Sequence, residues 1–180
     1  MIAVFYAHPY PRRSRANRRL FDAIATLGGV ERRSLYDLYP DFSIDIEAEQ
    51  AALVAADVVV WQHPIYWYTA PALQKLWFEK VLALGWAFGR GGDMLRGKRC
   101  LWVATTGAPE DAYDEAGMHQ HAFGAFEPVV RQTAQFCGMK WLEPMIVHGA
   151  IRLSDDELEA QGQKYRARLI ELGATEVQRA

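Results

Sequence analysis

The sequence predicts an α/β fold, a doubly wound parallel sheet of five strands with helices on both faces. Short apolar runs, as at 2–7, 58–61 and 100–105, are typical of strands that are buried on both sides. Segments with apolar residues at helical spacing separate these runs, and such alternation indicates a parallel sheet. The 180 residues contain no linker or internal repeat, so we expect one domain, residues 1–180.

Local signals set the expected boundaries of the elements. Ser14 is expected to cap the first helix and Gly28-Gly29 to end it. Pro71 suits the first turn of a later helix, and Ser154 to Glu157 form a capping box. Strands are expected at 2–7, 30–36, 57–62, 100–105 and 141–147 (interrupted at Pro144), helices at 14–27, 47–56, 71–84, 128–137 and 154–172, and a loop at 37–45.

The bulk composition excludes several classes of protein. Twenty basic residues against 22 acidic ones argue against a general nucleic-acid binder. The chain has no apolar run of spanning length and no signal-peptide pattern at its start, so a cytoplasmic location is expected. Cys100 and Cys137 are far apart and show no zinc spacing, which predicts reduced packing residues and no metal site.

Parallel sheets of this kind bind ligands beyond the carboxyl ends of their strands, so the loops after strands one, three and four are the first candidates. In the first of these loops, Ser14 and Asn17 stand at the mouth of a helix, where free N–H groups favour an anion. No GxGxxG or GxxxxGK[ST] pattern is present. The alternative is that Ser14 is only a cap and His8 an ordinary polar residue.

Five arginines cluster at positions 12, 13, 15, 18 and 19. Their spacing places most of them on a solvated helix face. One of them can reach a phosphate, because a guanidinium forks onto such groups, and an acidic partner surface is a further alternative. The sequence does not choose among these three.

Aromatic residues gather in one stretch of the chain. The chain has 22 aromatic residues (6 Trp, 8 Tyr and 8 Phe), and eight of them lie between Trp61 and Phe88. Trp61 belongs to a buried strand and is expected to be packing. Tyr66, Trp67 and Tyr68 fall on a loop, where a stacked flat heterocycle, a subunit interface or ordinary loop packing would explain them.

The loop after the fourth strand is built of small residues, Thr105-Thr106-Gly107-Ala108. Small side chains let the backbone approach a ligand closely, and the two hydroxyls and the backbone amides can bond to ring edges. Alone this loop is a weak signal, but it is expected at the same end of the sheet as the other two.

At these residues the chain resembles the flavodoxin-like NAD(P)H:quinone oxidoreductases. The matching motifs are Tyr6-Ala7-His8-Pro9, Ser14-x-Ala16-Asn17, 57–68, 71–77, Gly85-Trp86-Ala87 and Thr105-Thr106-Gly107. Within that family it is most similar to the ancillary proteins of glutathione-regulated potassium-efflux systems, through 39–45 and Trp61-Gln62-His63-Pro64.

The resemblance implies non-covalently bound FMN. Its phosphate and ribityl chain would meet His8, Ser14, Arg15, Ala16 and Asn17. Its ring would lie along Ile65, Tyr66, Trp67 and Tyr68 on one edge and along Thr105, Thr106, Gly107 and Ala108 on another. The family commonly has a second glycine where this chain has Ala108, so contact at that position is less firmly implied.

By the same resemblance, Tyr113 and His119 would be the catalytic pair. A tyrosine hydroxyl backed by a histidine can stabilise or protonate the charge that hydride transfer leaves on the flavin. The alternative is that both are loop residues without a proton role. The implied reaction is a two-electron transfer from NADH or NADPH through FMN to a quinone, and the sequence does not say which donor or quinone is used.

A second function implied by the resemblance is a regulatory one, in which the protein binds and activates a glutathione-gated potassium/proton antiporter at the inner face of the cell membrane. An acidic flavodoxin-type electron shuttle fits less well, because the net charge is only −2 and residues 8–14 contain no glycine. The family forms homodimers, and Trp77, Phe78, Trp86 and Phe88 are the residues expected at the partner and at the substrate pocket.

Overall fold

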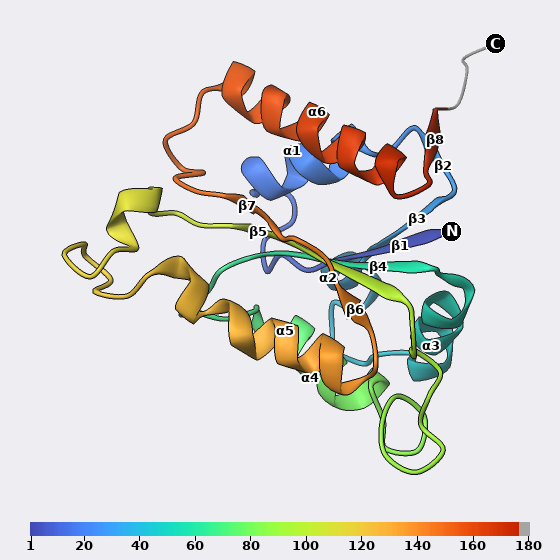
Figure 1. The fold of residues 1–180 in the computed structure, drawn as a ribbon. Coiled ribbons are helices and arrows are strands. Elements are labelled where there is room, and N and C mark those ends of the chain that lie inside the picture. The colour runs from blue at the N-terminus through green and yellow to red at the C-terminus, as the bar shows by residue number, and fades with distance from the viewer. Residues whose placement is uncertain (177–180) are drawn as a thin grey trace.

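The computed structural model describes residues 1–176, and the central sheet is parallel throughout. The sheet has the strand order β3-β1-β4-β5-β6, with β7 also paired to β5 (Figure 1). Its strands are β1 (Ile2–Tyr6), β3 (Val30–Ser34), β4 (Val58–Pro64), β5 (Arg99–Thr105), β6 (Lys140–Trp141) and β7 (Met145–Val147). The predicted doubly wound α/β fold is therefore confirmed.

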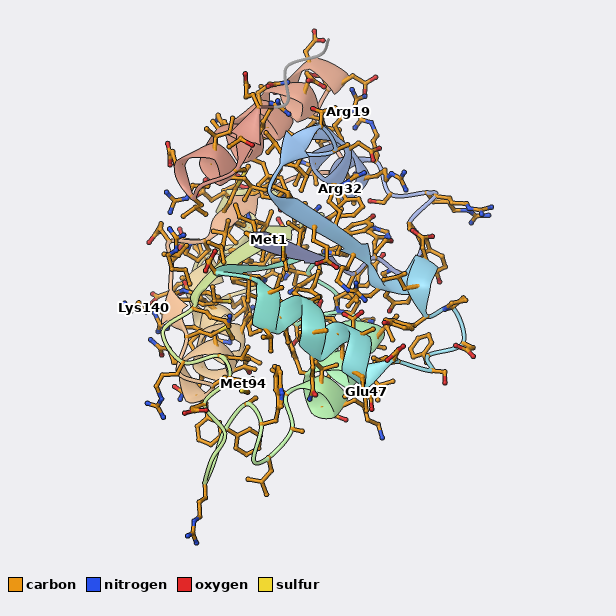
Figure 2. All side chains as sticks on the ribbon, turned by 90° about the vertical axis from the view of Figure 1, so that its right-hand side faces the viewer. Met1, Arg19, Arg32, Glu47, Met94 and Lys140 are labelled. Atoms are coloured by element: carbon orange, nitrogen blue, oxygen red, sulfur yellow. The ribbon has the colours of Figure 1, made fainter. Side chains whose placement is uncertain are left out.

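Helices cover both faces of this sheet (Figure 1). On one face lie α1 (Ala16–Ala23) and α6 (Asp155–Glu171), and on the other α3 (Ile46–Ala55), α4 (Ala72–Val81) and α5 (Glu127–Phe136). The remaining elements are short: α2 (Leu35–Leu38), η1 (Glu110–Ala112), η2 (Phe123–Ala125) and the antiparallel pair β2 (Leu27–Gly28) and β8 (Thr175–Glu176). Figure 2 looks onto the β3 edge, with Arg32 on that strand between Arg19 above and Glu47 below.

Two hydrophobic cores lie against the two faces. Along β1, Ala3 and Phe5 face the α3–α5 layer, while Ile2, Val4 and Tyr6 face α1 and α6. Because both faces are covered, every position of the strand must be apolar, which explains the continuous apolar runs in the sequence. As predicted, both cysteines are buried and free.

Several boundaries differ from the sequence-based expectation. Helix α1 begins at Ala16, and Arg15 rather than Ser14 is its N-cap residue. Strand β3 ends at Ser34 because Leu35 already begins the short helix α2. As expected, the fifth strand is interrupted at Pro144, which lacks the N–H that a ladder needs.

The expected interface role of Trp77 is wrong. Its side chain is fully buried, and its Nε1 donates a hydrogen bond of 2.7 Å to the equally buried Glu49. Trp61 is likewise fully buried, as predicted. Helical spacing alone cannot separate these two situations, because a wide aromatic stripe on a helix serves a core and an interface equally well.

Candidate functional site

Two adjoining cavities open at the carboxyl ends of the parallel strands. The inner cavity has a volume of about 380 Å³ and the outer one about 540 Å³. They share Ile65, Gly107 and Ile151 as lining residues, so they form one continuous cleft. This is the end of the sheet at which the topology places a ligand, because β1 and β4 begin crossovers that run in opposite directions there.

Every residue that the sequence suggested for the cofactor and for the catalytic pair lines one of these cavities, whereas Trp77, Phe78, Trp86 and Phe88 line neither. The inner cavity is lined by His8, Ser14, Arg15, Ala16, Asn17, Ile65, Tyr66, Thr105, Thr106 and Gly107. The outer cavity is lined by Ile65, Trp67, Tyr68, Gly107, Ala108, Tyr113 and His119. The structure brings the whole predicted set together, and the binding and catalytic roles of its members stay predictions.

The start of α1 forms one wall of the inner cavity. Ser14 Oγ accepts a hydrogen bond of 3.2 Å from the backbone N–H of Arg18, so its own hydroxyl proton remains available for a ligand. His8, which also lines this cavity, accepts a hydrogen bond of 3.0 Å at Nδ1 from the N–H of Tyr10. Burial lowers the pKa of His8, which favours the neutral imidazole.

Ion pairs distinguish four of the five clustered arginines. The guanidinium of Arg15 donates to Leu153 O at 2.5 Å and to Asp155 at 2.8 Å, so its charge is directed toward the start of α6. Arg18 pairs with Asp22 and Arg19 with Glu159. Arg13 lines the inner cavity and has no carboxylate partner within residues 1–176, which makes it the arginine best placed to reach a phosphate.

Buried hydrogen bonds tie α1, β4 and β5 together beneath the inner cavity. Asn17 Nδ2 donates to Thr105 Oγ1 at 2.6 Å, and Gln62 Nε2 donates to Asn17 O at 2.8 Å. All three side chains are almost fully buried. The asparagine that resembles a cofactor contact in the sequence therefore also fixes the distance between two walls of the cavity.

Sequence reasoning missed the loop that follows β7. The backbone N–H of Ala150 donates to Thr106 O and that of Gly149 donates to Ala108 O, both at 2.8 Å. This loop supplies Ala150, Ile151 and Arg152 to the cleft. The rule that led to the loops after strands one, three and four applies equally to strand five, but an interrupted strand gave too weak a signal to place its end.

His148, also on this loop, lies beside Thr106. Thr106 Oγ1 donates to Ala108 O at 2.7 Å and lies 3.1 Å from His148 Nδ1, from which it can accept when that nitrogen carries the proton. Burial lowers the pKa of His148, and its ring lies 5.6 Å from that of Tyr113 between centroids. His148 thus braces the loop 106–108 and one side of Tyr113.

The aromatic loop is a tight turn with an unusual backbone. Tyr66 and Thr69 exchange hydrogen bonds of 2.9 and 3.1 Å, and the central residues Trp67 and Tyr68 have φ of 49° and 66°. This is the geometry of a type I′ turn, which normally selects Asn or Gly. The Trp67 residue is 91% exposed, so the turn presents a large apolar surface to the outer cavity and to solvent.

The candidate catalytic pair meets by stacking. The rings of Tyr113 and His119 lie 4.3 Å apart between centroids with an interplanar angle of 25°. The Tyr68 hydroxyl lies 3.4 Å from His119 Nδ1, and no hydrogen bond joins Tyr113 to His119 in the described residues. Burial raises the pKa of Tyr113, which keeps its phenol protonated at neutral pH. The structure places Tyr113 and His119 side by side as stacked rings, and their catalytic role stays a prediction.

The cleft fits FMN in its distribution of chemistry. The inner cavity offers the Ser14 hydroxyl, the Arg13 guanidinium and the start of α1 to an anionic group, while the outer cavity offers aromatic faces to a flat ring.

Among residues 1–176, no group of three or more His, Cys, Asp or Glu side chains is arranged to hold a metal ion. None of the helices in the same range has the length and apolar character needed to cross a bilayer.

Comparison with known proteins agrees with this geometry. A family described as having a flavodoxin-like fold matches residues 1–171. The chain is 50% identical over 171 residues to the glutathione-regulated potassium-efflux system ancillary protein KefF of Klebsiella aerogenes, covering 95% of this chain and 96% of that protein.

Solved structures with the same fold carry varied descriptions. A protein described as a thermophilic tryptophan halogenase from Streptomycin violaceusniger has a TM-score of 0.89 at 34% identity, covering 94% of this chain and 98% of that one. The general stress protein 14 of Treponema denticola in complex with FMN has 0.86 at 30%, covering 95% and 98%. An NADPH-quinone reductase from P. pentosaceus has 0.84 at 25%, covering 93% and 96%.

Proposed function

This chain belongs to the family with the flavodoxin-like fold, and from that premise we propose that it is an FMN-dependent NAD(P)H:quinone oxidoreductase. Because its structural neighbours carry different descriptions, the fold alone does not decide the activity, and the site must do so. The observation that carries the proposal is the cleft, in which a polar inner end continues into an aromatic outer end. The FMN-bound neighbour and the quinone reductase neighbour support the same assignment.

The residues of the inner cavity bind and orient the cofactor. Ser14 and Arg13 hold its phosphate, and the start of α1 adds the positive end of a helix dipole. The loop 105–108 bonds to the polar edge of the ring through the backbone N–H groups of Gly107 and Ala108, since Thr106 N–H and the Thr106 hydroxyl already donate to Val147 O and Ala108 O. When bound, FMN supplies a ring that accepts a hydride from NAD(P)H and passes it to a quinone.

The residues of the outer cavity exclude water and handle the proton. Trp67, Tyr68 and Met118 form apolar walls against which a nicotinamide and a quinone ring can lie one after the other. The phenol of Tyr113 is protonated at neutral pH and can donate a hydrogen bond to negative charge at the ring edge. His119 stacks on that phenol and fixes its orientation.

The test is an absorption spectrum followed by turnover. Purified protein should carry or take up FMN, and the yellow colour should bleach with NADH or NADPH and return when a quinone is added. Tyr113→Phe should bind FMN normally and lower the rate about 100-fold, the lower end of the usual contribution of a proton donor. A protein that cannot take up FMN would rule the proposal out.

We also propose a homodimer, because an apolar groove remains on the surface between α4 and α5. The groove has a volume of about 420 Å³ and is lined in part by Phe78, Leu82, Leu84, Phe88 and Phe136. Leu84 and Phe136 are 74% and 64% exposed, which is high for large apolar residues. Light scattering should give twice the chain mass, and Phe136→Asp should shift it to that of a monomer while FMN binding to the inner cavity persists.

The alternative function, activation of a potassium-efflux antiporter, is favoured by the 50% identity to KefF. The two functions are compatible and separate experimentally. In cells that contain the matching antiporter, a Tyr113→Phe variant that has lost quinone reduction but still raises potassium efflux would make binding the primary role. Loss of both activities together would instead make turnover a requirement for activation.

A further inference from the structure

We propose that Arg152 binds a phosphate group of the dinucleotide donor at the outer end of the cleft. The inference rests on the proposed function and goes further, because it names the residue that distinguishes the charged donor from an uncharged quinone. Arg152 lies on the loop after β7, outside every motif that the sequence suggested for the site.

The charge of the outer cavity points to an anionic ligand. Among residues 1–176, Arg152 is the only Lys, Arg, Asp or Glu that lines it, since the other lining residues are aromatic, aliphatic, methionine, glycine, proline or histidine. Eight other arginines of the described chain are held by carboxylates, at positions 15, 18, 19, 32, 33, 131, 166 and 168. Within residues 1–176, Arg152 has no carboxylate partner, so its charge is free for a ligand.

The backbone that carries Arg152 is anchored to the site itself. Its own N–H donates to Gly149 O at 2.8 Å, and Gly149 and Ala150 in turn donate to Ala108 and Thr106. The loop that carries the Arg152 side chain is therefore joined by backbone hydrogen bonds to the loop 106–108, which is proposed to bind the flavin ring. A flexible side chain on a fixed base loses only its own rotamer freedom on binding.

Each cavity thus has one arginine without a carboxylate partner in the described residues. Arg13 lines the inner cavity beside the ion-paired Arg15, and Arg152 lines the outer one together with Trp67, Tyr113 and Met118. If Arg13 in the inner cavity holds the phosphate of FMN, Arg152 in the outer cavity remains available for the substrate. A quinone without charge gains nothing from Arg152, whereas the phosphates of NADH and NADPH form charge-assisted hydrogen bonds with it.

The experiment compares two arginines that are both exposed and without a carboxylate partner in the described chain. Arg152→Gln removes the charge in the cleft, and Arg90→Gln removes the same charge from the loop between α4 and β5, at the opposite end of the sheet (Figure 1). Titration calorimetry of the FMN-loaded proteins with NAD⁺ and NADP⁺ measures binding without turnover. We expect Arg152→Gln to weaken binding about tenfold, Arg152→Lys to retain part of it, and Arg90→Gln to match the wild type.

The outcomes separate the phosphate sources and the two proposals. An equal loss for NAD⁺ and NADP⁺ assigns Arg152 to the diphosphate, and a loss for NADP⁺ alone assigns it to the 2′-phosphate. Equal affinities of Arg152→Gln and Arg90→Gln, or a wild type that binds neither dinucleotide, would overturn the inference. A wild type that binds the dinucleotides but reduces no quinone would refute the proposed function. The calorimetric comparison would still decide whether Arg152 binds the dinucleotide.

Discussion

Replacing Trp67 by asparagine should stabilise the protein without ligand and weaken its binding of FMN. Trp67 has φ of 49°, in the left-handed region, and it is 91% exposed. A large side chain in that region is strained, and asparagine is one of the few residues that tolerate it. The backbone strain at Trp67 therefore lowers the stability of the protein, and the packing of its exposed side chain does not offset that loss.

The expected size of the effect follows from the same two observations. The left-handed conformation costs about 1–2 kcal/mol for an ordinary residue, and we take asparagine to recover about half of it. The tryptophan buries only a tenth of its surface, which amounts to about 0.5 kcal/mol of hydrophobic stabilisation. Trp67→Asn should therefore leave the free energy of unfolding unchanged or raise it by up to about 0.5 kcal/mol.

Urea denaturation of the FMN-free protein and titration with FMN measure the two effects. Loss of one stacking surface of about 0.5–1.5 kcal/mol should weaken FMN binding roughly 2- to 12-fold. Phe42→Asn is the matched control, because Phe42 also has a left-handed backbone, with φ of 66°, but lines neither cavity. A Trp67→Asn protein that is about 1 kcal/mol less stable, or that binds FMN as the wild type does, would refute the reasoning.

Three further predictions concern the buried polar groups. Thr105→Val leaves the buried Asn17 amide without its acceptor and should lower the free energy of unfolding by about 1–3 kcal/mol in urea, with a parallel loss of FMN affinity. Glu49→Gln removes the buried charge that faces Arg33 and should cost about 3 kcal/mol in the same assay, a loss that Arg33→Met in the same chain should partly restore. His63 is fully buried, and burial lowers its pKa to about 4. The unfolded chain therefore binds one proton more than the folded one between pH 6.5 and 4, so stability should fall by about 1.4 kcal/mol per pH unit as the pH decreases through that window, and His63→Gln should flatten this slope.

The sequence predicts the fold well because its strongest signals are local. An apolar run such as Ile2–Tyr6 can be buried on both sides in few ways, and alternation with helices restricts the topology to a parallel sheet. The boundaries are less accurate, since Ser14 looks like a helix cap but the helix begins only at Ala16. The short helix α2 was missed because four residues carry no periodic signal.

The sequence predicts those site residues that follow a strand whose end can be recognised in the sequence. Loops after continuous strands were found, whereas the loop with His148 and Arg152 was not, because Pro144 divides the strand before it. Hydrogen bonds between distant segments, such as that from Asn17 to Thr105, leave no pattern in the sequence. Such contacts decide which side chains remain free for a ligand, and only the structure supplies them.

The aromatic stretch from Trp61 to Phe88 serves two different purposes, and the backbone separates them. Trp61 and Trp77 are fully buried on regular elements, where an aromatic side chain is stabilised by its own packing. Trp67 and Tyr68 lie on a turn that favours Asn-Gly, with positive φ at both positions. Strain of this kind persists where it contributes to function, so a left-handed exposed aromatic pair indicates a ligand more strongly than aromatic content does. The outer cavity beside the turn is where that ligand is expected.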